Sequence, residues 1–175
     1  MSVLLFDLDE TLMVEEPAAV AAFEATARWA ARAYELGERF ALERRARQEV
    51  FPEVEAVLRE LSAAHVLGLV TNGASCLQRD KLGASGLGGY FKVVVVSGDV
   101  GVGKPGPSVF RRALAELAAD RAVMVGDSVE NDVRGALSAG LGAVWCNRAG
   151  LPRPEDLDVP EIASLSELPR VLEAI

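Results

Sequence analysis

Asp7 and Asp9 are the first residues of this chain whose type and spacing indicate chemistry. They follow a short apolar run, Val3–Phe6, and a single leucine separates them. Side chains alternate between the faces of an extended strand, so both carboxylates are expected to point the same way. Two carboxylates held that close resist joint ionisation unless a cation or a proton lies between them. The pair predicts a metal-dependent site or, as the plainer alternative, a polar loop at a strand end.

Further polar residues follow three other apolar runs. They are Thr71 and Asn72 after the second run, Lys104 after the third, and Asp127, Asn131 and Asp132 after the fourth. The carboxyl ends of parallel strands meet at one edge of an open α/β sheet, where such folds place their active sites. Four sets of residues in this order are hard to obtain by chance, so we expect them to form one site.

This set of residues suits a phosphoryl group held beside a metal ion. Asp7, Asp9 and Asp127 would supply the hard oxygen ligands that Mg²⁺ prefers. Lys104 near Asp7 would offset carboxylate repulsion by about 4 kcal/mol per close pair at an effective dielectric of about 20, before desolvation. The hydroxyl and amide after the second run would hydrogen-bond the transferred group, although either could instead cap the next helix.

The glycine-rich segment before Lys104 nearly matches the nucleotide-binding pattern G-x-x-x-x-G-K-[ST]. It reads Gly98-Asp99-Val100-Gly101-Val102-Gly103-Lys104-Pro105. The proline stands where a Ser or Thr hydroxyl should hold Mg²⁺, and it has no N–H for a phosphate cradle. We therefore reject a nucleotide-binding loop. Lys104 remains a candidate site residue, held on a stiff Lys-Pro turn.

Strand and helix patterns alternate along the chain and predict the scaffold. Strands are expected at residues 3–7, 66–71, 93–97, 122–126 and 143–146. Helices are expected at residues 53–64, 75–82, 107–118, 131–139 and 166–174. This alternation predicts an α/β fold with a doubly wound parallel sheet.

The segment from about residue 17 to residue 49 breaks the alternation. It is rich in Ala, Glu and Arg, has no strand candidate, and favours two helices broken near Gly37. It lies between the first strand and the helix before the second, so it is an insertion beside the active edge. We expect a core of residues 1–14 and 51–175 and a short helical insertion of residues 15–50.

Composition argues against several other classes of protein. The 175 residues, half of them hydrophobic, suit one compact domain with a small insertion. A net charge of -8 without a basic stripe argues against nucleic acid as a partner. No apolar run approaches the roughly 18 residues that span a bilayer. With no signal peptide expected, and too few cysteines (Cys76, Cys146) for a disulfide framework or a zinc site, we expect a cytoplasmic protein.

The ordered motifs resemble those of the haloacid dehalogenase-like (HAD) hydrolase superfamily. They are Asp7-Leu8-Asp9-Glu10-Thr11, Thr71-Asn72-Gly73, Lys104-Pro105 and Gly126-Asp127-Ser128-Val129-Glu130-Asn131-Asp132. The resemblance implies a Rossmann-like core, a helical cap inserted after the first motif, and a Mg²⁺-dependent phosphatase. By the same resemblance, Asp7 would be the nucleophile that forms an aspartyl-phosphate. Asp9 would protonate the leaving oxygen and then activate water, and its backbone carbonyl would help to hold the metal.

The resemblance implies roles for the remaining motif residues as well. Thr71 and Asn72 would steady the phosphoryl oxygens, and the lysine would neutralise charge between nucleophile and phosphate. Asp127 would bind Mg²⁺ directly, with Asp132 and Asn131 in support. This division suits phosphoryl transfer, which depends on positioning and charge neutralisation.

The second acid of the first motif, Asp9, selects among the reactions of the superfamily. An alkoxide leaving group needs an acid, whereas a halide leaves without a proton, so dehalogenation is disfavoured. Hydrolysis of a phosphate monoester is the simplest prediction. A phosphomutase or phosphotransferase of sugar phosphates and a catalytically silent binding protein on the same fold stay open as alternatives.

The substrate is expected to be a small phosphorylated molecule. Residues 71–82 resemble the nucleotidase and acylneuraminate-phosphate phosphatase branch, which favours a nucleoside monophosphate or a sugar phosphate. So short a cap could leave the site open or be completed by a second subunit, so a monomer and a homodimer are both compatible with the sequence. Candidates for a specificity surface, although an amphipathic cap helix would carry such residues anyway, are Glu15, Glu16, Arg28, Trp29 and Arg32.

Overall fold

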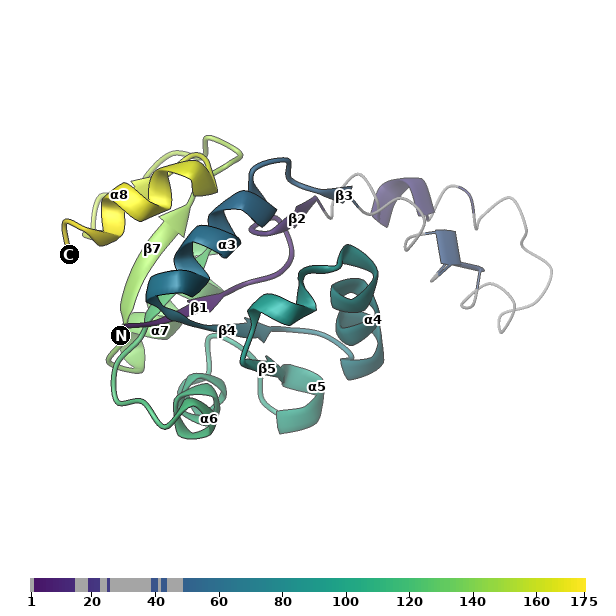
Figure 1. Cartoon of the computed structure of the whole chain (residues 1–175), viewed down its shortest axis with the longest axis horizontal. Coiled ribbons are helices and arrows are strands. Elements are labelled where there is room, and N and C mark those ends of the chain that lie inside the picture. The colour runs from purple at the N-terminus through teal and green to yellow at the C-terminus, as the bar shows by residue number, and fades with distance from the viewer. Residues whose placement is uncertain (1, 15–18, 23–24, 26–38, 41, 44–48) are drawn as a thin grey trace.

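A six-stranded parallel sheet is the centre of the computed structural model (Figure 1). The structure describes residues 2–14, 19–22, 25, 39–40, 42–43 and 49–175. The strand order is β5-β4-β1-β6-β7-β8, and each neighbouring pair is parallel. The bounds are β1 Val3–Phe6, β4 Val66–Thr71, β5 Val93–Val96, β6 Val123–Gly126, β7 Gly142–Cys146 and β8 Glu161–Ile162. The predicted α/β fold is confirmed.

The first strand, β1, occupies the middle of the sheet because it is apolar on both faces. All four of its residues are buried, and Leu5 lies between Gly68 of β4 and Met124 of β6. A strand that pairs on both sides and is covered on both faces must be apolar throughout. A Cβ on Gly68 would lie 2.9 Å from Leu5 Cδ2, so the side chain of Leu5 fills the space that glycine leaves.

Helices cover both faces of the sheet, as the alternation of strands and helices predicts. Their bounds are α3 Val54–Ala64, α4 Ser75–Ser85, α5 Ser97–Val100, α6 Pro107–Leu117, α7 Gly135–Ser138 and α8 Leu168–Leu172. On one face, Leu4 and Phe6 share a cluster with buried residues of α3 and α8. On the other, Leu5 packs in a cluster with residues of α6 and α7. None of the helices in the described part of the chain is long and apolar enough to cross a membrane.

Several short elements differ from those expected from the sequence. The helix expected at 131–139 is a wide turn, Val129–Arg134, followed by α7. The last helix is a 3-10 turn, Leu165–Glu167, followed by α8, and another 3-10 turn spans Leu87–Tyr90. The expected third strand ends at Val96, and Ser97 begins α5. Elements of three to six residues are too short for a periodic signal in the sequence.

A two-stranded antiparallel stem leads into the insertion and out of it. Its strands are β2, Met13–Val14, and β3, Glu49–Val50, and Met13 pairs with Val50. The expectation that residue 49 belongs to a segment without a strand is therefore wrong. Residues 19–22, 25, 39–40 and 42–43 are helical. Gly37 and the five candidate specificity residues lie outside the described residues, and the division into core and insertion stays a prediction.

The packing of α6 on the sheet generates a stability test at Phe110. This side chain has no exposed surface and belongs to the cluster around Leu5. We expect Phe110→Ala to lower the free energy of unfolding by about 3–5 kcal/mol, since it removes buried apolar surface and leaves a cavity. Leu151→Ala is the control, because Leu151 is 57% exposed, and it should change that free energy by less than about 0.5 kcal/mol. Urea unfolding measures both, and equal values would contradict this account of the core.

Candidate active site

The central strand delivers Asp7 to the carboxyl edge of the sheet. Asp7 follows β1, and its backbone N–H still donates to the carbonyl of Val125 in β6 at 3.0 Å. The residue is 7% exposed. Because β1 lies between β4 and β6, the residues at the ends of those two strands are its closest neighbours at this edge.

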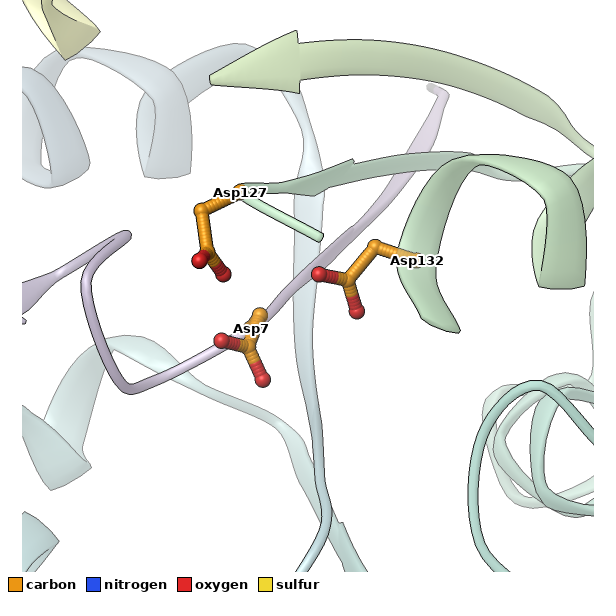
Figure 2. Close-up of side chains that lie close together, drawn as sticks. All are labelled: Asp7, Asp127 and Asp132. Atoms are coloured by element: carbon orange, nitrogen blue, oxygen red, sulfur yellow. The ribbon is translucent and has the colours of Figure 1, made fainter. Parts of the chain in front are cut away.

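The ammonium group of Lys104 lies between two buried carboxylates. Its Nζ is 2.5 Å from Asp7 Oδ1 and 2.6 Å from Asp132 Oδ1. Asp127 completes the group, and Figure 2 shows the three side chains close together. Each of them offers one oxygen, and the three oxygens lie within 4.8 Å of one another. We call Asp7, Asp127 and Asp132 the carboxylate group.

Burial and mutual repulsion disfavour full ionisation of the carboxylate group. Burial, as the largest cause, and the charges of Asp132 and Asp127 together raise the pKa of Asp7 to about 8, against the opposing effect of Lys104. Burial, and then the charge of Asp132, raise the pKa of Asp127 to about 6. Burial lowers the pKa of Lys104, but Asp7 and Asp132 outweigh it and raise that pKa above its usual range. One cation does not balance three carboxylates, and their hard oxygens are the donors that Mg²⁺ prefers.

A turn and a glycine together fix the position of the Asp132 side chain. Its Oδ2 accepts a hydrogen bond from the backbone N–H of Ser128 at 2.9 Å. A Cβ on Gly126 would lie 2.4 Å from Asp132 Cγ, so only glycine at the end of β6 leaves room for this carboxylate. From the sequence we expect Asp132 in a supporting role, and the structure brings it into direct contact with Lys104.

Asn72 fixes the backbone from which the Lys104 side chain starts. Its Nδ2 donates to the Lys104 carbonyl at 2.9 Å, and its Oδ1 accepts from the Lys104 N–H at 2.8 Å. A Cβ on Gly103 would lie 2.5 Å from Asn72 Oδ1, which explains the glycine before the lysine. The amide therefore orients Lys104, while its expected contact with a phosphoryl oxygen stays a prediction.

The carboxylate of Asp9 lies outside the carboxylate group and has different partners. Its Oδ1 is 2.8 Å from Lys81 Nζ, and its Oδ2 accepts from Gln78 Nε2 at 3.0 Å. The expectation that Asp7 and Asp9 point the same way assumes a continuous strand, but β1 ends at Phe6. The predicted metal contact of the Asp9 backbone carbonyl stays a prediction.

Two residues of this site, Gln78 and Lys81, were not among the predicted ones. Both lie on α4 and are buried, at 5% and 4% exposure. Their spacing of three places them on one face of a helix. No local pattern in the sequence marks this face of α4 as buried, because Gln and Lys are rarely buried unless they have partners.

One cavity of about 350 Å³ collects all the predicted site residues. They are Asp7, Asp9, Thr71, Asn72, Lys104, Asp127, Asn131 and Asp132, and the structure adds Glu10 and Ser128 to the lining. Glu10 has φ +54°, in the left-handed region that non-glycine residues rarely adopt. The ordered motifs of the sequence therefore converge on one site at the carboxyl edge of the sheet.

Comparison with known proteins decides the family. Residues 31–140 match the family model described as haloacid dehalogenase-like hydrolase. This chain belongs to the haloacid dehalogenase-like hydrolases. The family resemblance of the motifs is thereby confirmed, whereas the roles of the individual HAD motif residues stay proposals.

Relatives of known name cover most of this chain. It is 47% identical to the phosphoserine phosphatase of Thermus thermophilus, over 82% of this chain and 57% of that protein. It is 40% identical to the human N-acylneuraminate-9-phosphatase, over 70% of this chain and 52% of that protein. A HAD phosphatase structure from Thermococcus onnurineus matches with a TM-score of 0.81 at 30% identity, over 98% of both chains. The chain spans about half the length of the curated relatives it matches.

The close approach of Gly126 to Asp132 predicts that adding one methyl group at position 126 destabilises the protein. Gly126→Ala should lower the free energy of unfolding by about 1–3 kcal/mol, because the new Cβ forces a buried carboxylate to move. Gly89→Ala is the matched control, since a Cβ there has no heavy atom within 4 Å. Urea unfolding compares the two variants, and a Gly126→Ala protein as stable as the control would contradict the assigned place of Asp132.

The raised pKa values of Asp7 and Asp127 predict how the stability of the folded protein depends on pH and on Mg²⁺. The folded protein holds protons that the unfolded chain has lost, so stability without metal should fall as the pH rises from about 4 to about 8. Mg²⁺ competes with those protons, and it should therefore raise the melting temperature more at pH 8 than at pH 5. Thermal unfolding with Mg²⁺ or with EDTA, at matched ionic strength, measures the difference.

The control for this prediction is Asp127→Asn, which removes one ligand without changing the volume of the side chain. Its Mg²⁺-induced shift in melting temperature should be smaller than that of the wild type at pH 8. A shift that depends on neither pH nor this substitution would contradict Mg²⁺ binding at the carboxylate group.

Proposed function

We propose that this chain is a Mg²⁺-dependent phosphate monoester hydrolase that works through an aspartyl-phosphate at Asp7. The observation that carries the proposal is the contact of one Lys104 ammonium with both Asp7 and Asp132, in a buried group of three carboxylates. This arrangement offers a nucleophile, a fixed positive charge and a set of metal ligands within one small cavity. Phosphoryl transfer requires these three components above all.

The donor set fits the Mg²⁺ that the family implies. Asp7, Asp127 and Asp132 present oxygens only, they lie within reach of one another, and they carry more negative charge than one lysine balances. Mg²⁺ binds through few carboxylates and leaves room for phosphate oxygens. When bound, it would neutralise charge that develops on the transferred phosphoryl group.

The side chains of the cavity divide the reaction into two steps. In the first, an oxygen of Asp7 bonds to phosphorus, the bond from phosphorus to the ester oxygen breaks, and Asp9 gives that oxygen its proton. In the second, Asp9 takes a proton from water as the water oxygen attacks phosphorus, which releases inorganic phosphate and restores the Asp7 carboxylate. Lys104 offsets the charge of Asp7 and the phosphoryl group throughout, and Thr71 orients a phosphoryl oxygen.

The presence of Asp9 and the names of the relatives both favour phosphate esters as substrates. An alkoxide leaves with a proton that Asp9 would supply. The two curated relatives are named for phosphatase activity on phosphoserine and on an N-acylneuraminate 9-phosphate. We propose a small phosphorylated metabolite as substrate, a nucleoside monophosphate or a sugar phosphate first, with phosphoserine added to the panel of candidates.

The free thiols fit the proposed cytoplasmic location. Cys76 is exposed, Cys146 is buried, and neither takes part in a disulfide. A reducing compartment keeps exposed thiols in this state. Whether the protein acts as a monomer or as a homodimer belongs to the same proposal, and the size of the protein in solution would decide it.

The proposed function predicts release of inorganic phosphate from small monoesters. Wild type should release it from at least one of p-nitrophenyl phosphate, phosphoserine, nucleoside monophosphates and sugar phosphates, with Mg²⁺ and not with EDTA. Asp7→Asn should abolish release, because the nucleophile is lost while the shape of the side chain is kept. The matched control is Asp99→Asn, a surface aspartate paired with Arg79 outside the cavity, which should keep wild-type turnover. Release that survives Asp7→Asn would contradict the proposed nucleophile.

A further inference from the structure

Two buried side chains of α4 hold both oxygens of the Asp9 carboxylate. Lys81 Nζ lies 2.8 Å from Asp9 Oδ1, and Gln78 Nε2 lies 3.0 Å from Asp9 Oδ2. The two residues are 4% and 5% exposed, whereas the Asp9 side chain is 28% exposed and lines the cavity. A cation and an amide from one helix thus fix a partly exposed carboxylate at the edge of the site. Neither residue belongs to the four motifs.

The amide of Gln78 connects the ends of two strands. Its Nε2 lies 3.0 Å from Asp9 Oδ2, 3.1 Å from Thr71 Oγ1 and 2.7 Å from the carbonyl oxygen of Asn72. A backbone carbonyl oxygen can only accept hydrogen bonds, so the amide nitrogen must be the atom that faces Asn72. Gln78 therefore joins the segment after β1 to the end of β4 through one nitrogen.

The amide oxygen of Gln78 indicates that glutamine is present here for its amide nitrogen and not for packing alone. Its Oε1 is buried and has no hydrogen-bond partner among the described residues. A buried amide oxygen without a partner is unfavourable, so an apolar side chain would pack at lower cost. The loop beside it is shaped for this residue, because Gly73 has φ +140° and a Cβ there would lie 3.1 Å from Gln78 Nε2.

We propose that Gln78 and Lys81 are positioning residues that hold the Asp9 carboxylate beside Thr71, where it meets the leaving oxygen of the substrate. The inference rests on the proposed phosphatase reaction and deepens it. In the first step of that reaction the ester oxygen takes the Asp9 proton as its bond to phosphorus breaks. The place of the Asp9 oxygens therefore decides how well an ester with a basic leaving group reacts.

The test compares two esters that differ in their need for that proton. Phosphoserine leaves as an alkoxide and needs an acid, whereas p-nitrophenyl phosphate has a weakly basic leaving group and needs little help. The value of kcat/KM reports the steps up to departure of the leaving group. Gln78→Leu, which changes no charge, should lower kcat/KM for phosphoserine about 10- to 100-fold and for p-nitrophenyl phosphate less than about threefold.

Further variants separate positioning from folding. Gln78→Asn keeps an amide but shortens the side chain by one methylene. It should lower kcat/KM for phosphoserine more than for p-nitrophenyl phosphate, and it should keep the melting temperature of the wild type. Lys81→Met should show the same unequal loss, because it removes the partner of Asp9 Oδ1. Arg79→Met is the matched control: Arg79 lies on the same helix, is exposed and pairs with Asp99 rather than with Asp9. It should leave both values unchanged.

A double-mutant cycle tests whether Gln78 acts through Asp9. If it does, adding Gln78→Leu to Asp9→Asn should cost less than about twofold in kcat/KM, since the carboxylate that it positions is already lost. A purely structural role would give the same loss in both backgrounds and for both esters.

The outcomes distinguish this inference from the proposed function. Wild type that releases phosphate from none of the monoesters in the panel with Mg²⁺ would overturn the proposed function and this inference with it. Where phosphoserine is no substrate, an alkyl phosphate of the panel that is hydrolysed takes its place in the comparison. Wild-type hydrolysis together with unchanged or equally lowered values for the Gln78 and Lys81 variants would overturn the positioning role alone. An unequal loss that disappears in the Asp9→Asn background is the expected result.

Discussion

One buried ammonium group, that of Lys104, is the interaction on which the rest of the site depends. It contacts Asp7 and Asp132, and all three side chains are almost inaccessible to water. Taking charges out of water is costly, and their attraction repays that cost only where the remaining polar atoms are also bonded. Two sets of hydrogen bonds support the group, because Asn72 bonds the backbone of Lys104 and the N–H of Ser128 bonds Asp132 Oδ2. The glycines of the motifs follow from the same requirement for space.

The parallel sheet brings these groups together because its central strand lies between two strands, β4 and β6, whose ends also carry site residues. Asp7 follows β1, Thr71 ends β4, and Asp127 follows β6. Their side chains line one cavity at the carboxyl edge of the sheet. Family membership agrees with this geometry, since the matched residues 31–140 include the ends of β4 and β6.

Two cations divide the acidic residues of the site into two units. Lys104 pairs with the carboxylate group, and Lys81, with the help of Gln78, pairs with Asp9. Two aspartates only two positions apart in sequence thus have separate surroundings. This separation gives a physical basis for assigning them different tasks in the proposed reaction. The proposed nucleophile lies in the carboxylate group, and the proposed acid contacts Gln78 and Lys81 of α4 at the edge of the cavity.

The sheet, the strand ends and the residues that meet at them can be predicted from the amino-acid sequence. Apolar runs mark buried strands such as β1, and polar residues after them mark the active edge, because both signals are local. The side-chain contacts, in contrast, depend on the folded chain: Lys104 lies 97 residues from Asp7 in sequence, and Lys81 lies 72 residues from Asp9. Contacts at such separations depend on how helices and loops pack, which no local pattern specifies. For the same reason, the orienting role of Asn72 and the burial of Gln78 became visible only in the folded chain.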